Sequence, residues 1–221
     1  MIEAFVFDLD GVLLDSEQVW DEAREQLAEE RGGRWHAGAQ RDMMGMSSNE
    51  WSRYMHDVIE LPEPPEEINR EVVERLAAIY REYLPVIDGA REAVERMAAR
   101  FPLGVASSSN RELIELVLEL LGVSQLFAAF VSSEEVGRGK PAPDVYLEAA
   151  RRLDVDPTNA AAVEDSHNGI LAAKAAGMCV LAIPNAHFPP GPDALEQADA
   201  VLGSLAELTP GTVEATCRRS G

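Results

Sequence analysis

Basic side chains are few in this chain compared with acidic ones. Its 221 residues carry 19 Lys and Arg against 39 Asp and Glu, which gives a formal net charge of −20. Lysine is especially scarce, since Lys140 and Lys174 are the two that occur. Nucleic acids and anionic membrane surfaces are bound through basic patches, so this balance argues against either as a partner. It also implies that a phosphorylated ligand needs local cations that offset the overall field.

The chain also has few cysteines and lacks long apolar runs. Cys179 and Cys217 form neither a framework nor a CxxC motif, and we expect both to be free thiols in a reducing compartment. No apolar run approaches the ~18 residues of a membrane span, and no secretory leader pattern precedes the first strand. A soluble, cytoplasmic protein is therefore expected. No heptad repeat or large apolar stripe is evident, and we expect a monomer or a weak homodimer.

The most informative stretch is AFVFDLDGVLLDSE, at residues 4–17. Its first four residues are short, apolar and rich in aromatic and β-branched side chains, which predicts a buried strand. Asp8 and Asp10 follow at the carboxyl end of that strand, where open α/β sheets bind ligands. Two carboxylates so close together repel each other unless a cation lies between them. Taken alone, the stretch is also compatible with an ordinary Asp-Gly turn.

The remainder of the chain shows two different patterns. Residues 16–84 predict helices only, with a turn-rich stretch at 38–48 and a proline cluster at 62–65. From residue 85 onward, predicted helices alternate with predicted strands at 103–107, 130–132, 160–163, 179–183 and 200–202. This alternation predicts a parallel sheet covered on both faces, to which the first strand belongs. We therefore expect an α/β core domain of residues 1–15 and 85–221, an inserted all-helical cap domain of residues 16–84, and a loose tail from Thr209.

Four polar segments fall at or just beyond the carboxyl ends of predicted strands. They are Asp8 with Asp10, Ser107 in VASSSN, Lys140 in GRGKPAPDVY, and Glu164 with Asp165 in AVEDSHNG. In these motifs and their order the sequence resembles the haloacid dehalogenase (HAD) superfamily of phosphohydrolases. The resemblance covers nearly the whole chain and is to the subgroup with a helical cap, which includes β-phosphoglucomutase and sugar- and polyol-phosphate phosphatases. It implies a doubly wound, Rossmann-like core.

The resemblance also implies roles for these residues. Asp8 would be the nucleophile that forms an aspartyl-phosphate, and Asp10 would act as general acid and then as general base. A carboxylate attacks phosphorus when a metal shares the charge of the phosphate, and Mg²⁺ suits hard oxygen ligands. The implied magnesium ligands are Asp8, the backbone carbonyl of Asp10, and Asp165, with Glu164 a ligand in some relatives.

The substrate's phosphate would lie against Ser107 and nearby backbone N–H groups at a helix N-terminus. Lys140 would supply a fixed positive charge to both the phosphate and Asp8. The full set of expected substrate contacts is Gly11, Ser107, Ser108, Asn110 and Lys140 from the core, with Trp20 and Met44 from the cap. For Trp20 and for Met43, Met44 and Met46, burial in the cap core is the alternative interpretation.

Three reactions of the superfamily compete: haloacid dehalogenation, phosphonate cleavage, and phosphate transfer by either a mutase or a phosphatase. Haloacid dehalogenation belongs to a branch without the second aspartate, so Asp10 argues against it. Phosphonate cleavage through a Schiff base needs a cap lysine, and residues 16–84 contain none. The mutase branch carries a cap histidine where this sequence has Trp20, and a cap-loop arginine where it has Ser48. We therefore predict a magnesium-dependent phosphatase of a small phosphorylated metabolite, with a mutase and a non-catalytic phosphometabolite-binding protein as alternatives.

Overall fold

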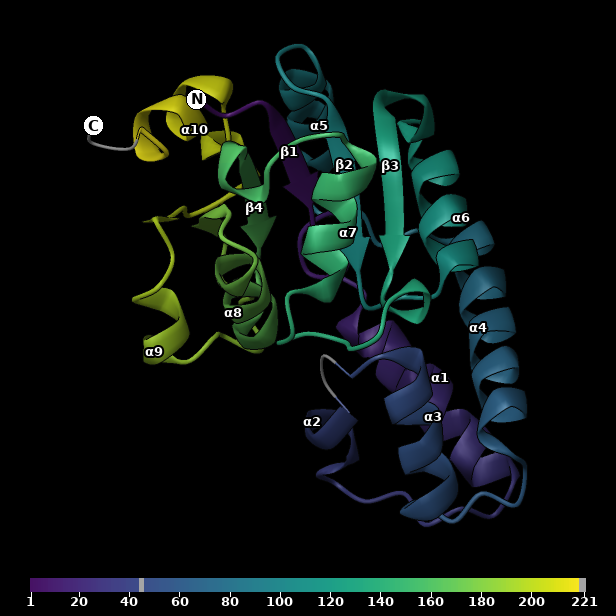
Figure 1. The fold of residues 1–221 in the computed structure, drawn as a ribbon. Helices are drawn as coiled ribbons and strands as arrows, with labels where there is room; N and C mark the ends of the chain where they lie inside the picture. The colour runs from purple at the N-terminus through teal and green to yellow at the C-terminus, as the bar shows by residue number, and fades with distance from the viewer. Residues whose placement is uncertain (44–45, 219–221) are drawn as a thin grey trace.

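The computed structural model describes residues 1–43 and 46–218, and a six-stranded parallel sheet lies at its centre (Figure 1). Its strands are β1 (Ala4–Phe7), β2 (Leu103–Ser107), β3 (Phe127–Ser132), β4 (Ala160–Glu164), β5 (Cys179–Ala182) and β6 (Ala200–Val201). They lie in the order β3-β2-β1-β4-β5-β6. The chain thus builds outward from β1 in one direction and then returns to build in the other. The doubly wound fold is confirmed, and its topological switch point lies between β1 and β4.

Strand β1 is buried on both sides, which explains its unbroken apolar sequence. Phe5 and Phe7 pack on the face covered by α5 (Ala90–Ala98) and α6 (Arg111–Leu121). Val6 packs on the opposite face, against α7 (Asp144–Arg152) and α8 (His167–Ala175). The short helix α9 (Pro192–Leu195) lies beside α8. Four single turns of 3₁₀ helix complete the core: η1 (Ser124–Leu126), η2 (Ser133–Glu135), η3 (Pro157–Asn159) and η4 (Leu205–Glu207).

Four helices lie beyond the carboxyl ends of the strands, and we call them the cap (Figure 1). They are α1 (Glu17–Glu30), α2 (Ala39–Met43), α3 (Ser48–Asp57) and α4 (Pro65–Glu82). The long helix α4 also contacts α6 of the core. Helix α2 occupies part of the stretch that the sequence predicted as turns. Helix α3 begins at Ser48, because the N–H and Oγ of Ser47 both donate to Glu50 in its first turn.

The two connections between cap and core run side by side. The backbone N–H of Asp15 donates to the carbonyl of Pro85 at 2.9 Å, and that of Ile87 donates to the carbonyl of Leu13 at 3.0 Å. Leu14 and Val86 form an antiparallel bridge between these bonds. The helices therefore enter and leave the core through one narrow, two-stranded connection.

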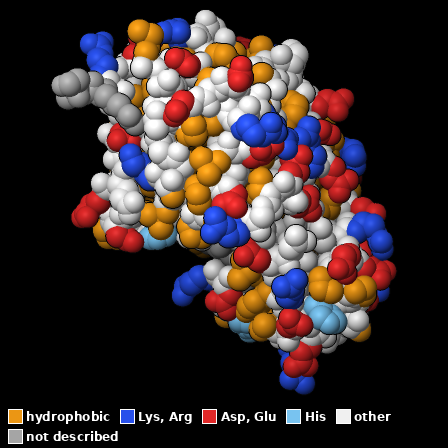
Figure 2. All heavy atoms as spheres, viewed as in Figure 1, with side chains coloured by type: hydrophobic (Ala, Val, Ile, Leu, Met, Phe, Trp, Pro, Cys, Tyr) orange, Lys and Arg blue, Asp and Glu red, His pale blue; other side chains and the backbone are white. Residues whose placement is uncertain are grey.

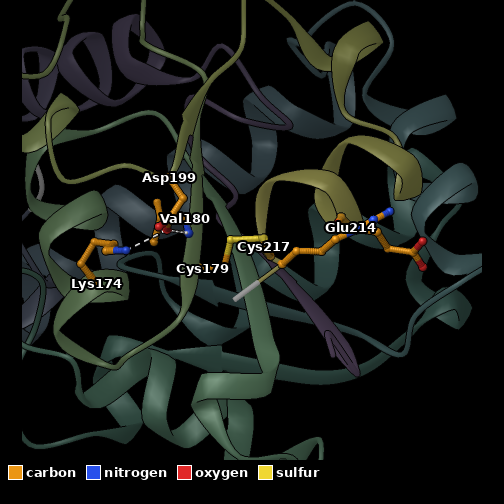
Figure 3. Close-up of a disulfide and its surroundings, with 7 residues drawn as sticks. Lys174, Cys179, Val180, Asp199, Glu214 and Cys217 are labelled. Carbon is orange, nitrogen blue, oxygen red and sulfur yellow. Dashed lines mark hydrogen bonds and ion pairs between the residues drawn. A yellow bond between two sulfur atoms is a disulfide. The ribbon is translucent and has the colours of Figure 1, made fainter. Parts of the chain in front are cut away.

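The C-terminal segment corrects two expectations. Cys179 and Cys217 form a disulfide with a Cα–Cα distance of 5.8 Å, so the prediction of free thiols was wrong (Figure 3). Residues 209–218 of the tail are also not loose, because α10 (Pro210–Thr216) buries Val213 and Thr209 accepts a hydrogen bond from the backbone of Thr212. The rest of this prediction falls outside the described residues. The cause of both corrections is the fold itself, which places the end of α10 beside the start of β5. Two cysteines 38 residues apart give no sequence signal of this meeting.

The surface is polar and mixed in charge. Figure 2 shows acidic and basic side chains interspersed over the face that is also seen in Figure 1. Ion pairs account for part of this mixture, including Arg75 with Glu30 and Arg31 with Glu71 between α1 and α4. Among the described residues, no helix combines the length and the apolar character that crossing a bilayer requires.

Candidate active site

One cavity lies between the carboxyl edge of the sheet and the cap, directly beyond the switch point. Asp8 follows β1, and Asp165 follows the neighbouring strand β4. Ser107 ends β2, and Lys140 lies in the loop before α7. The residues that line the cavity from the core are Asp8, Asp10, Ser107, Ser108, Ser109, Lys140, Asp165, Ser166 and Asn168. The structure thus brings the four predicted motifs together, although they are spread over more than 150 residues of sequence.

Lys140 is fixed between two carboxylates. Its Nζ donates to Oδ1 of Asp8 at 2.6 Å and to Oε1 of Glu164 at 2.6 Å, and all three side chains are buried. Burial alone would lower the pKa of Lys140, but the two carboxylates outweigh that effect and raise it. The ammonium group therefore stays charged at neutral pH, within reach of the predicted nucleophile.

Three buried carboxylates surround this single ammonium group. Oxygens of Asp8, Glu164 and Asp165 all lie within 4.8 Å of one another. Burial raises the pKa values of Asp8 and Asp165 well above the ordinary range, and repulsion by Glu164 adds to the effect at both. Oδ1 of Asp165 is buried and has no hydrogen-bond partner among the described residues. An unpaired carboxylate oxygen in an acidic group of this kind fits a divalent cation with oxygen ligands.

Glu164 differs from Asp165 because donors already occupy both of its oxygens. Oε1 accepts from Lys140 and from the hydroxyl of Tyr146 at 2.6 Å. Oε2 accepts from the backbone N–H of Asp165 and from the N–H and Oγ of Ser166. A Cβ at Gly169 would lie 1.9 Å from the same carboxylate, so glycine leaves room for it. These bonds suit Glu164 to orienting Lys140, whereas Asp165 offers the free oxygen.

Asp10 is held by hydroxyl groups and by one indole. Oγ of Ser16 donates to its Oδ1 at 2.5 Å, and Oγ of Ser109 donates to its Oδ2 at 2.6 Å. Weaker bonds come from Nε1 of Trp20 at 3.3 Å and from Oγ of Ser107 at 3.4 Å. The sequence prediction included neither Ser109 nor Ser16 among the site residues, and Ser16 precedes α1 without a side-chain capping bond. The hydroxyl of Ser16 instead orients the predicted general acid.

Other predicted substrate contacts lie in different surroundings. Ser108 lines the cavity. Gly11 has a φ of +83°, and a Cβ there would lie 1.9 Å from Oδ2 of Asp165, so it allows these two loops to approach. The amide of Asn110 donates to Glu134 at 2.7 Å and to Asn69 at 3.1 Å, at the contact between core and cap. Direct contact of Gly11, Ser108 and Asn110 with a substrate stays a prediction.

The cap wall of the cavity is aromatic, with one cation. Trp20 and Trp51 meet edge to face with ring centroids 5.9 Å apart, and Cζ of Arg24 lies 4.7 and 4.8 Å from the two centroids. Glu17, Met43 and Met46 complete this wall. Met43 is both buried and cavity-lining, so the two alternatives for it coincide. The prediction for Met44 falls outside the described residues.

Arg24 was missed by the sequence prediction, which compared only two cap positions with the mutase pattern. The available signal was its spacing, because Arg24 lies one helical turn after Trp20 on the same face of α1. Burial lowers its pKa to about 10. Burial, followed by repulsion from Asp10, raises the pKa of Glu17 to about 7. A buried cation and a partly neutralised acid thus face the cavity from the cap.

The sequence was compared with those of known protein families and proteins. The model of the haloacid dehalogenase-like hydrolases matches residues 2–177. Hexitol phosphatase B of Escherichia coli K12 is 35% identical over 214 residues, covering 94% of this chain and 95% of that protein. A phosphorylated carbohydrates phosphatase of Thermotoga maritima is 34% identical over 179 residues, covering 80% and 82%.

A solved structure adds the comparison of folds. CbbY from Rhodobacter sphaeroides, in complex with phosphate, superposes with a TM-score of 0.86 at 27% identity, covering 97% of this chain and 100% of that one. Family match, sequence relatives and fold all point the same way. This chain belongs to the haloacid dehalogenase-like hydrolases.

Proposed function

We propose that this hydrolase is a magnesium-dependent phosphatase of sugar or polyol phosphates that works through an aspartyl-phosphate. The observation that carries the proposal is the contact of Lys140 with Asp8 at 2.6 Å, within a cluster of carboxylates that also contains Glu164 and Asp165. This arrangement lies at the switch point of the sheet, where such folds bind ligands. The relatives named hexitol phosphatase and phosphorylated carbohydrates phosphatase support the substrate class.

The proposed chemistry has two steps. In the first, an oxygen of Asp8 forms a bond to phosphorus, the bond from phosphorus to the sugar oxygen breaks, and Asp10 gives its proton to the departing alkoxide. In the second, a water attacks the aspartyl-phosphate, Asp10 takes a proton from it, and Asp8 is released with inorganic phosphate. The hydroxyls of Ser16 and Ser109 hold Asp10 in place for both transfers. Lys140, Ser107 and Ser108 hold the phosphate oxygens.

The residues fit a magnesium ion, as the unpaired oxygen of Asp165 indicates. Asp8, Asp165 and the backbone carbonyl of Asp10 would hold it. When bound, Mg²⁺ supplies positive charge that offsets the phosphate and the surrounding carboxylates. Glu164, whose oxygens already accept five hydrogen bonds, would keep Lys140 in position.

The helical block of residues 16–84 would act as a cap that opens for substrate and closes for chemistry. Its two connections to the core are paired through Asp15 and Pro85, which allows the block to move as one body about one place. Closure would exclude bulk water and leave one water for the second step. The domain boundaries at residues 15 and 85 are part of this proposal.

A mutase is the second candidate, and Arg24 is the observation that favours it. A phosphoglucomutase-type reaction needs a cap cation for the second phosphate of its bisphosphate intermediate. Arg24 is such a cation, but Glu17 and Asp10 lie among the charges that act on it. These acids oppose a second dianion, so hydrolysis remains the preferred assignment.

We also propose that the protein is a cytoplasmic monomer or weak homodimer. The disulfide between Cys179 and Cys217 weighs against a cytoplasmic location, since disulfides are more typical of oxidising compartments. Alkylation of thiols before lysis of the producing cells tests it, and size-exclusion chromatography at several concentrations tests the assembly. An intact Cys179–Cys217 disulfide in the alkylated protein is the result that the structure predicts, and it would count against a reducing compartment.

Phosphate release tests the function itself. The purified protein with Mg²⁺ is expected to release phosphate from p-nitrophenyl phosphate and from a panel of sugar and polyol phosphates, and chelation is expected to abolish release. The mutase alternative is tested with β-glucose 1-phosphate and a trace of the bisphosphate. Glucose 6-phosphate without free phosphate would favour the mutase, and binding without turnover would favour a non-catalytic protein.

A further inference from the structure

Arg24 is a buried guanidinium group in the cap wall of the cavity. Its residue is 8% exposed, and it lines the cavity opposite the predicted catalytic carboxylates. Its Nε is buried and has no hydrogen-bond partner among residues 1–43 and 46–218. Leaving a buried donor unpaired costs free energy, and more so when the group is charged. A site of this kind is completed when a ligand supplies the acceptor.

The indole rings explain how the guanidinium is held without such a partner. Its Cζ lies within 5 Å of the ring centroids of both Trp20 and Trp51. Cation–π contacts stabilise the charge and fix the plane of the group, but they supply no hydrogen-bond acceptor to Nε. The two tryptophans come from α1 and α3, so the group is positioned by packing within the cap.

The surrounding charges decide what kind of acceptor fits. Glu17 lines the same cavity, and Asp10 faces it from the core. A second phosphate or a carboxylate on the substrate would pair with Arg24, but it would also lie near Glu17, which repels it when ionised, and near Asp10, which repels it once its proton has been given up. A hydroxylated carbon chain avoids this conflict, since each hydroxyl can accept from the guanidinium and donate to a carboxylate.

We propose that Arg24 binds neighbouring hydroxyl groups of the substrate at the end away from the phosphate, and so selects uncharged polyol and sugar chains. Phosphomonoesters with a second anionic group would be poorer substrates. The proposal rests on the proposed phosphatase activity and names the residue that chooses among its substrates. Arg24 is a specificity residue here, and the chemistry of the phosphate remains with the core.

The test uses three phosphomonoesters that differ at the far end. A hexitol 6-phosphate carries a terminal CH₂OH group, the matched aldonic acid 6-phosphate carries a carboxylate in its place, and p-nitrophenyl phosphate carries no hydroxyl. The wild-type protein is expected to prefer the hexitol 6-phosphate over the aldonic acid 6-phosphate in kcat/KM. A preference for the aldonic acid ester would overturn the proposal.

The variant Arg24→Met keeps the bulk of the side chain between the indoles and removes its donors. We expect kcat/KM for the hexitol 6-phosphate to fall by at least about tenfold, as for a lost hydrogen bond to a charged group, and that for p-nitrophenyl phosphate to change by less than about threefold. Arg24→Lys, which restores charge and a donor, is expected to recover part of the loss. Arg34→Met is the matched control, since Arg34 is an exposed cap residue paired with Glu60.

The outcomes separate the two proposals. If the wild-type protein releases no phosphate from any of the three esters, the proposed phosphatase function fails. If it does, but Arg24→Met loses activity equally on the hexitol and aryl esters or on neither, the assignment of Arg24 fails and the phosphatase function stands. Retained turnover of the aryl ester shows that the variant is folded.

Discussion

The two walls of the cavity are built on opposite principles. On the core wall, Asp8 and Asp10 each have partners at 2.6 Å or closer before any ligand is bound. On the cap wall, Met43 and Trp51 are almost fully buried, and Nε of Arg24 has no hydrogen-bond partner among the residues that the structure describes. The core wall thus holds Asp8 and Asp10 in place and leaves Oδ1 of Asp165 free, whereas Nε of Arg24 on the cap wall still lacks an acceptor among the described residues. Under the proposed function, the core would carry out the reaction and the cap would select the substrate.

The largest effect is expected from the core. Asp8→Asn removes the attacking oxygen, so kcat/KM should fall by at least about a thousandfold on every phosphomonoester, whatever its far end. Steady-state kinetics with an aryl and a polyol ester measure this. Asp15→Asn is the control, because Asp15 is an exposed carboxylate on the same loop. A loss of activity confined to the polyol ester would contradict the assignment of the reaction to the core wall.

A smaller loss of activity is expected when the hydrogen bonds that hold Asp10 are removed. Ser109→Ala removes the 2.6 Å bond from the core, and Trp20→Phe removes the 3.3 Å bond from the cap. We expect kcat for p-nitrophenyl phosphate to fall about tenfold for Ser109→Ala and about threefold or less for Trp20→Phe, because the shorter bond to a carboxylate is the stronger one. Ser109→Thr should restore activity. Equal losses, or no rescue by threonine, would count against Ser109 as a positioning residue.

A still smaller change in kinetics is expected from a substitution at the contact between core and cap. Glu134, in η2 of the core, accepts from Ser48 of α3 at 2.8 Å and from Asn69 of α4 at 3.4 Å, as well as from Asn110. Glu134→Gln should weaken cap closure by about 1 kcal/mol, which raises KM about fivefold for all substrates. Glu135→Gln is the matched control, since Glu135 pairs with Arg111 and Arg152 within the core. A rise in KM for the control as well would refute the role of Glu134 as a link.

No effect on turnover is expected from the disulfide, although stability should fall. Cys179 begins β5, at the opposite edge of the sheet from the cavity. Cys217→Ser removes a cross-link between positions 38 residues apart, which typically costs about 2–4 kcal/mol of unfolding free energy. Urea unfolding and phosphate release measure the two quantities on the same sample. Unchanged stability would mean that the disulfide does not form in solution.

The sequence predicted the core wall far better than the cap wall. Strand β2 has the predicted bounds, because turn residues delimit a short apolar run there. Asp8, Ser107, Lys140 and Asp165 were recognisable because each follows a strand that belongs to one sheet. Parallel topology alone then brings their side chains to one edge.

The remainder depends on contacts that no local pattern encodes. Arg24 looked like one more charged residue on a helix, and its burial depends on Trp51 from another helix. Ser109 was the third residue of a serine run, and only the loop geometry after β2 aims its Oγ at Asp10. Cys217 meets Cys179 because α10 folds back onto the sheet. In each case tertiary packing, rather than propensity or spacing, decides the role.

The central claim is that Asp8 carries the phosphoryl group during turnover. In Asp10→Asn the first step can still occur with a good leaving group such as p-nitrophenolate, while the second step lacks its base. Mixing this variant with p-nitrophenyl phosphate and Mg²⁺, quenching in acid and mapping the peptides by mass spectrometry should find one phosphoryl group on Asp8. Hydroxylamine should remove it, as expected of an acyl phosphate. A phosphoryl group on another residue, or a burst of p-nitrophenol with Asp8 unmodified, would contradict the account.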